Sequence, residues 1–248
     1  IHHKEEKFTM KLKKIASLAL AGVMAVSMLT ACNGSTTDDT QKPEEPDTTP
    51  ATGYSATFEG RLSDRGDANI SMSDSSDLNA ALKFAMDFVS DSKIASDYDQ
   101  NWKDMVAFVS ATDTEKTDLH QAAIELVKKA DTDRESLNKT SAGEVLDVLN
   151  PNEKNGKDLY KKDNLDVVLL YAVDGGLSTD AAVMEVADTL NKEIEDLVRS
   201  YSTAGSVGET VENVYTYTGS VSADTITLDA NHGKSMTFVA VEIVRELA

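Results

Sequence analysis

Residues 235–247, SMTFVAVEIVREL, form the stretch that decides the predicted fold. Its side chains alternate as in a β-strand, with Val239, Val241 and Ile243 on one face. The other face carries Phe238 and Ala240, so the strand is apolar on both sides. Strands buried on both faces have this composition, whereas a half-solvated strand alternates apolar and polar residues. We therefore predict a central strand here.

Two further strands are predicted upstream, because both segments alternate with a period of two. They are ENVYTYTG, residues 212–219, and DTITLDA, residues 224–230. Gly219 is expected to form the turn between them, and Asn231-His232-Gly233 the turn before the last strand. The C-terminal part of the chain is therefore predicted to be β.

The middle of the chain shows helical spacing of apolar residues. The predicted helices cover residues 77–89, 100–111, 114–130, 141–149 and 178–201. LDVVLLYAV, residues 165–173, suits either a buried strand or a buried helix, since a short apolar run has no diagnostic period. The helix is slightly favoured, because the preceding charged residues could form its first turn.

Two short strands are predicted at the start of the folded part, YSATFEGRL (54–62) and ANISMS (68–73). The turn-rich link SDRGD, residues 63–67, separates them. Strands at both ends with helices between them indicate one α+β domain, residues 54–248. In it, central helices pack on an antiparallel sheet built from N-terminal and C-terminal strands.

The N-terminal region has the pattern of a secretory signal. A basic stretch at residues 11–14 precedes an uncharged apolar run at 15–31, which ends in Leu29-Thr30-Ala31-Cys32. This ending resembles the lipobox of bacterial prolipoproteins. The resemblance implies that a signal peptidase recognises Leu29, Thr30 and Ala31, cuts before Cys32, and leaves Cys32 carrying a diacylglyceryl group. Two acyl chains hold a protein stably on a membrane. We therefore expect an extracytoplasmic protein, lipid-anchored to the bacterial cell membrane.

The sequence also predicts the roles of the segments before and after this apolar run. Residues 1–9 precede a plausible initiator, Met10, and are taken as a mistranslated leader; residues 10–31 are the signal peptide. Residues 32–53 comprise the lipidated cysteine and an acidic, Pro/Thr-rich stretch with almost no apolar side chains, which predicts a disordered tether. Fully extended at ~3.3 Å per residue, it would reach roughly 70 Å from the membrane.

Charge and cysteine content limit the function classes. Removing residues 1–31, which contain five basic and two acidic residues, leaves 19 basic against 41 acidic side chains, a net charge of −22. This acidity argues against nucleic acid and against electrostatic docking on anionic lipid. Cys32 is the only cysteine, so the folded part has no disulfide, thiol catalysis or cysteine-ligated metal. No cofactor and no metal site are predicted.

Two histidines are the candidate catalytic residues. His120 lies beside the apolar stripe of a predicted helix, and His232 lies in a predicted hairpin turn. Either could act as the general base for a serine, supported by Asp118 or Asp229. The alternative is a surface histidine at each position, which is favoured because no G-x-S-x-G motif is present.

Two other features are candidate binding sites. Arg65-Gly66-Asp67 matches the tripeptide that adhesive proteins present to integrins, and a glycine turn explains it equally well. Tyr215 and Tyr217 point the same way from a predicted strand. If exposed they could stack on sugar rings or a peptide, whereas if buried they belong to the core. The core interpretation is favoured, because one sheet face must pack on helices.

These observations favour a non-catalytic binding module at the cell envelope. Its partner is an extracellular or envelope protein, a peptide or a glycan, and the lipid anchor supplies the membrane contact. The alternatives are an envelope hydrolase using His120 or His232, a surface adhesin using the Arg65-Gly66-Asp67 loop, and a structural role in the envelope. Nothing in the sequence identifies the ligand.

Overall fold

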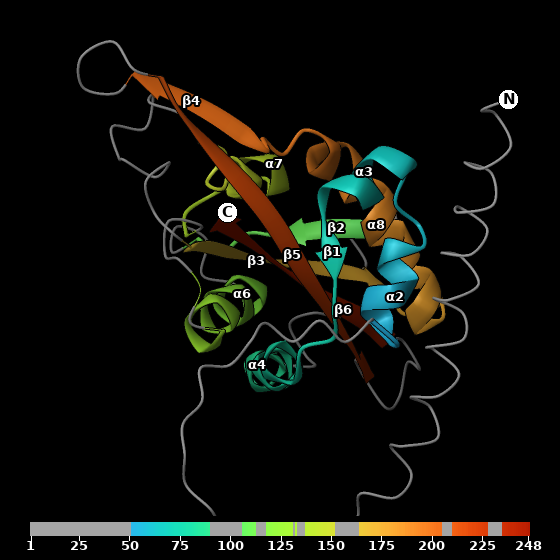
Figure 1. The fold of residues 1–248 in the computed structure, drawn as a ribbon. Coiled ribbons are helices and arrows are strands. Elements are labelled where there is room, and N and C mark those ends of the chain that lie inside the picture. The colour runs from blue at the N-terminus through green and yellow to red at the C-terminus, as the bar shows by residue number, and fades with distance from the viewer. Residues whose placement is uncertain are drawn as a thin grey trace, which may run out of the picture. The chain divides into compact units, whose positions relative to one another are not determined.

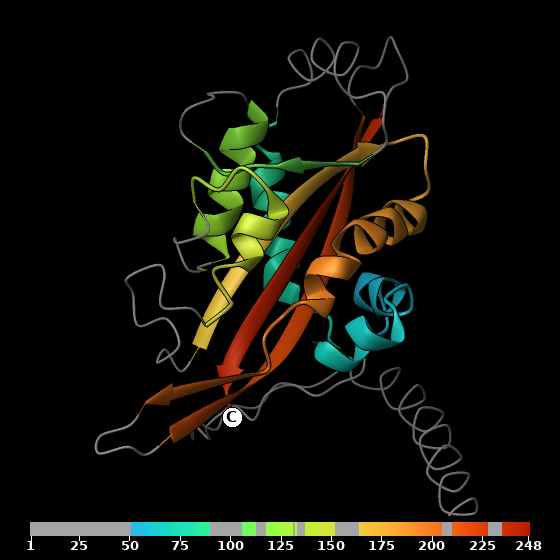
Figure 2. The ribbon, with the colours of Figure 1, turned by 90° about the horizontal axis from the view of Figure 1, so that it is seen from above.

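The computed structural model describes residues 51–89, 106–112, 118–130, 132, 137–151, 164–204, 210–227 and 235–248. These residues form a six-stranded mixed sheet with helices on both faces, which confirms the α+β class (Figures 1 and 2). The helices are α2 (Tyr54–Glu59), α3 (Asp64–Asn69), α4 (Ser76–Met86), α6 (Asp118–Lys129), α7 (Ala142–Leu146) and α8 (Thr179–Glu195). The strands are β1 (Ser71–Met72), β2 (Val106–Val109), β3 (Asn164–Asp174), β4 (Ser200–Ala204), β5 (Thr210–Thr227) and β6 (Ser235–Leu247).

Strand β6 is central, as the sequence predicts. The strand order is β1-β5-β6-β3-β2, and β4 forms an additional antiparallel pair with β5. Among the strand pairs of the described residues, β1–β5 alone is parallel. β6 pairs along its whole length with β5 and along almost all of it with β3, so both of its edges are occupied.

The two faces of β6 belong to two different cores. Val239, Val241 and Ile243 pack in the first core, whose helical residues come mainly from α7 and α8. Phe238 and Ala240 pack in the second core, against residues of α4 and α6. Figure 2 shows α4 and α6 on one side of the sheet and α2, α3 and α8 on the other. Helices on both sides explain why this strand is apolar on both faces.

Most helices of the middle region follow the prediction. α4, α7 and α8 each begin after a serine whose side chain accepts a hydrogen bond from the backbone three residues on, which satisfies a free N–H of the first turn. α8 is shorter than predicted and ends at Glu195. The Asn69 Nδ2 donates to the carbonyl oxygens of Ile194 and Glu195, at 3.1 and 3.0 Å, and so caps the last turn from another helix. Tyr201, predicted at the end of this helix, lies in β4 instead.

The predicted strand over residues 54–62 is wrong, because this segment contains helix α2. Tyr54 and Phe58 are four residues apart and therefore share one helical face, and both contact the first core. Ser55 Oγ donates to the Ser73 carbonyl and accepts from the Val221 N–H, both at 2.9 Å, which holds α2 on β5. Of the predicted strand 68–73, only Ser71 and Met72 form a strand, β1.

Two apolar segments that were predicted as helical are strands. Of residues 100–111, predicted as a helix, 100–105 lie outside the described residues and 106–109 form β2. Residues 165–173, where helix was favoured, lie in β3. β3 is buried on both faces between β2 and β6, so its side chains show no polar alternation. Phe108 and Tyr171 stack edge to face across the β2–β3 pair, with ring centroids 5.8 Å apart.

Gly219 does not form a turn, because β5 continues through it. It lies opposite Met72 of the edge strand β1. A Cβ at this position would lie 2.6 Å from Met72 Sδ and 2.8 Å from Ile70 Cδ1. The glycine therefore permits the close approach of β1, a common role of glycine inside a strand. The predicted turn at Asn231-His232-Gly233 lies outside the described residues.

Candidate functional site

The Arg65-Gly66-Asp67 tripeptide lies in helix α3, so the predicted loop between strands is wrong. Ser63 begins this helix, since its Oγ accepts the Gly66 N–H at 3.1 Å. Gly66 is buried, and a Cβ there would lie 2.9 Å from the Asn191 Oδ1 of α8. The glycine is therefore explained by the close packing of α3 on α8.

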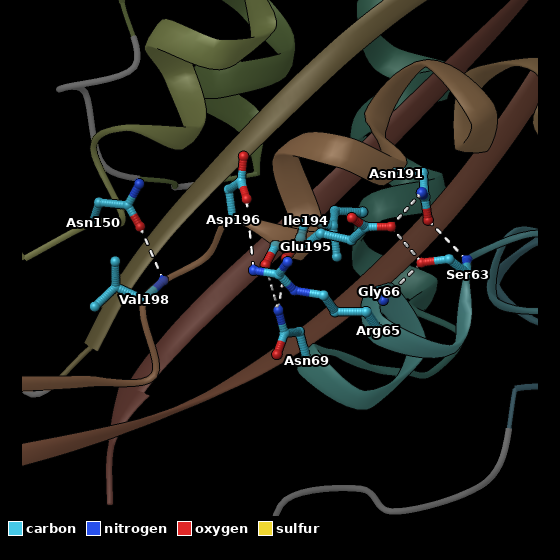
Figure 3. A network of polar contacts seen from close by, with 10 residues as sticks. All are labelled: Ser63, Arg65, Gly66, Asn69, Asn150, Asn191, Ile194, Glu195, Asp196 and Val198. Atoms are coloured by element: carbon cyan, nitrogen blue, oxygen red, sulfur yellow. Dashed lines mark hydrogen bonds and ion pairs between the residues drawn. The ribbon is translucent and has the colours of Figure 1, made fainter.

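A polar network joins α3 to the C-terminal end of α8 (Figure 3). The Ser63 N–H donates to Asn191 Oδ1 at 2.8 Å. Ser63 Oγ and Asn191 Nδ2 both donate to Glu195 Oε1, at 2.5 and 2.8 Å, and these bonds lower the pKa of Glu195. Arg65 pairs with Asp196 at 3.7 Å. Arg65 and Gly66 of the tripeptide therefore take part in the docking of α3 on α8.

Tyr215 and Tyr217 are buried in the first core, so neither offers a face for stacking on a ligand. The Tyr217 hydroxyl donates to the Val198 carbonyl at 2.7 Å, and burial raises the pKa of Tyr217 to about 12. The guanidinium of Arg245 lies 4.6 Å from the centroid of the Tyr215 ring. This is a cation–π contact within the core.

Of the other residues that the sequence suggests as functional, some lie in the described part of the chain and others lie outside it. His120 lies on α6 and is half-buried; Asp118, its suggested partner, is two positions away, where side chains of a helix do not face each other. His232, Leu29, Thr30, Ala31 and Cys32 lie outside the described residues. Within the described part of the chain, no group of three His, Cys, Asp or Glu residues is arranged to hold a metal ion.

A small cavity lies between β2, β3 and α6. Its volume is about 10 Å³, and its lining is apolar: Phe108, Val109, Ala111, Ala123, Leu126, Val127, Val145, Val168 and Leu170. A space of this size holds about one water molecule, and a dry apolar lining gives that water no partner. This cavity therefore offers no site for an organic substrate.

The surface that sequence reasoning missed is the end of the sheet on the α4 and α6 side. We call it the open face, and it comprises Asn164, Asp166, Thr216, Thr218, Val244 and Glu246. Strand register places them in two rows across β3, β6 and β5: Asp166, Val244 and Thr218, then Asn164, Glu246 and Thr216. All six side chains are exposed or half-exposed. Polar and β-branched side chains on three adjacent strands form a surface suited to contact with another molecule.

Glu242 lies at the border between the open face and the second core. Ser220 Oγ donates to Glu242 Oε2 at 2.9 Å. Burial raises the pKa of Glu242, and the charges of Asp166 and Asp77 raise it further, against the opposing effect of the Ser220 hydrogen bond. Because this carboxylate lies on a sheet face, it suits recognition by charge and hydrogen bonding better than chemistry in an enclosed pocket.

The raised pKa of Glu242 predicts a pH-dependent stability difference. Its folded form binds a proton more readily than its unfolded form, so its contribution to stability is fully present below the unfolded pKa of about 4.3 and is lost as pH rises through the folded value. We expect Glu242→Gln to raise the free energy of unfolding at pH 7 by about 1 kcal/mol, since the amide oxygen still accepts from Ser220.

This difference should shrink as pH falls through the raised pKa of Glu242 toward the unfolded value of about 4.3, because the folded wild-type carboxyl takes up its proton over that range. Urea unfolding at several pH values measures it. Glu246→Gln, which removes the same charge from the same strand face, is the control. A Glu242→Gln advantage that is independent of pH would contradict the assignment.

The chain matches no protein-family model, no curated protein and no solved structure. Among the described helices, none is long and apolar enough to span a membrane.

Proposed function

We propose that this chain is a lipid-anchored bacterial lipoprotein located outside the cytoplasm, and that its folded part is a non-catalytic module that binds another protein. The sequence supports the anchor through the lipobox-like ending Leu29-Thr30-Ala31-Cys32. The observation that carries the binding role is the open face, which presents side chains of three adjacent strands to solvent.

The start of the folded part supports a tethered arrangement. Asp74 Oδ2 accepts hydrogen bonds from the N–H and Oγ1 of Thr52, at 2.9 and 3.0 Å, and from the Gly53 N–H at 3.1 Å. The folded part is therefore held together from about residue 51 onward. The tether predicted over residues 32–53 is therefore shorter than predicted, because Thr52 and Gly53 at its end are bonded to the folded part. A tether of this composition lets the folded part extend away from the membrane, and it adds no second folded element.

The anchor is tested by replacing Cys32. Cells that express the full chain in a bacterial host are expected to incorporate labelled palmitate into it and to retain it in the membrane fraction. Cys32→Ala should abolish labelling, because Cys32 is the only cysteine of the chain and therefore the only thiol that can carry the diacylglyceryl group.

Thr30→Ser is the control, since it keeps a small residue before Cys32 and should remain labelled and membrane-bound. A wild-type chain without label, or a Cys32→Ala variant that still takes up labelled palmitate, would contradict the proposal.

A further inference from the structure

The hairpin of β4 and β5 extends beyond the end of β6. β4 pairs with residues 210–214 of β5, whereas the pairing of β5 with β6 begins at Tyr215. Figure 2 shows this two-stranded ribbon projecting past the rest of the sheet. Among the described residues, β5 is the only strand that pairs with β4, so one edge of β4 faces away from the sheet.

The hydrogen-bond pattern identifies the backbone groups on that outer edge. The Tyr215 N–H donates to the Arg199 carbonyl at 2.8 Å, which marks Arg199 and Tyr215 as a hydrogen-bonded pair. In an antiparallel ladder such pairs alternate with pairs whose N–H and C=O point outward. The register Ser200↔Val214 and Ser202↔Glu212 therefore places the N–H and C=O of Ser200 and Ser202 on the outer edge.

The outer edge of β4 lacks the usual protection against strand addition. Edge strands are commonly blocked by lysine or other charges, by proline or by a bulge. β4 has the sequence SYSTA, without charge and without proline. Its backbone therefore remains available as a template for an additional strand.

The side chains around β4 indicate what such a strand would carry. Ser200 and Ser202 are exposed and share a sheet face with Val214 and Glu212. An added strand would lie about 10 Å from β5, two strand spacings away. Because the two intervening side chains are small, a long lysine or arginine side chain can extend over them toward Glu212.

The opposite face of the ribbon is apolar at the corresponding position. Val211 is 48% exposed, which is high for a valine, and lies on the other side of the ribbon from Glu212. A strand whose residues alternate between cationic and apolar would therefore meet a carboxylate on one face and a methyl surface on the other. A second copy of this chain fits less well, because its own net charge is −19 and like charges oppose close pairing.

We propose that the outer edge of β4 binds an extended segment of a partner protein as an added strand, with lysine or arginine facing Glu212 and apolar residues facing Val211. Backbone hydrogen bonds to Ser200 and Ser202 supply affinity, and the alternating side chains supply specificity. This inference goes beyond the proposed function, because it assigns a second contact surface, distinct from the open face, and the chemistry of the segment that binds there.

The test uses the full chain in detergent and a fluorescent octapeptide in which lysine alternates with valine or threonine. Ser202→Pro is expected to weaken binding at least about tenfold, because proline removes an outward N–H without breaking a β4–β5 hydrogen bond. Ser202→Ala keeps that N–H and should bind within about twofold of the wild type. Fluorescence anisotropy measures both.

Two further comparisons separate the contribution of the Glu212 charge from that of the backbone hydrogen bonds. Glu212→Gln should weaken binding and reduce its salt dependence, whereas Asp67→Asn, an exposed residue of α3 with the same change in net charge, should not. A peptide N-methylated on alternate backbone nitrogens should fail to bind, which tests strand addition even if Ser202→Pro disturbs the hairpin.

Equal binding by Ser202→Pro and Ser202→Ala with unimpaired binding of the N-methylated peptide would overturn the proposal. So would a wild-type chain that does not bind the octapeptide, or one that uses this edge to dimerise instead. This binding test does not depend on the Cys32 experiment. A negative peptide-binding result would not contradict the lipid anchor, and a negative labelling result would not contradict strand addition at β4.

Discussion

Arg245→Ala is expected to lower the free energy of unfolding by about 3–4 kcal/mol. Arg245 is fully buried, and its Nη1 donates to the Leu149 carbonyl at 2.6 Å. Its guanidinium also stacks on the Tyr215 ring. Alanine would leave a cavity in the first core, remove the cation–π contact and take a donor from a buried carbonyl, so three losses combine.

Urea unfolding of the full chain measures this loss. Arg245→Met is the matched comparison, because it refills most of the volume but restores neither the hydrogen bond nor the charge. We expect it to recover about half of the loss, since apolar replacements of buried charged groups are often well tolerated. An alanine variant within about 1 kcal/mol of the wild type would show that this arginine does not hold the core together.

Gly175→Ala is expected to cost about 2–3 kcal/mol. Gly175 follows β3, and a Cβ there would overlap with Ser235 Oγ and with the backbone carbonyl of Ser235. The two residues also exchange hydrogen bonds of 3.0 Å, from the Gly175 N–H to the Ser235 carbonyl and from Ser235 Oγ to the Gly175 carbonyl. Because the obstacle is backbone, an alanine can be accommodated only if the start of β6 moves.

The neighbouring Gly176 is the control for this substitution. A Cβ at Gly176 would meet only the Asp174 side chain, at 3.3 Å, so Gly176→Ala should cost less than about 1 kcal/mol. Thermal or urea unfolding of the two variants gives the comparison. Equal losses for the two alanines would show that the contact between Gly175 and Ser235 is not the cause.

The predictable parts of the fold are those in which local pattern and tertiary environment agree. α4, α6 and α8 follow from their periodicity, because the buried side of each is a continuous apolar stripe. β3 shows why a buried strand is harder to predict from the sequence. A strand covered on both faces has no polar side, so its apolar run does not distinguish strand from helix.

The residues of the open face could be predicted only in part, for a similar reason. Along β6 the side chains on one face change from Phe238 and Ala240 to Glu242 and Glu246, and this change marks where the second core ends and the open face begins. The sequence of β6 contains this change of side chains. It does not show which part of the strand face is covered by helices, because that depends on tertiary packing. Arg245 shares the apolar face of Val241, so its burial also follows from register rather than from residue type.

In the proposed function, the folded part is tethered through Cys32 and binds a partner protein through the open face at the end of its sheet. This binding is tested most directly by placing a photo-crosslinking amino acid at Thr218, on the open face, or at Asp180, on α8 against the opposite face, in the full chain in living cells. We expect a discrete protein adduct from position 218 and none from position 180. The same adducts from both positions, or no adduct from position 218, would contradict the proposed function.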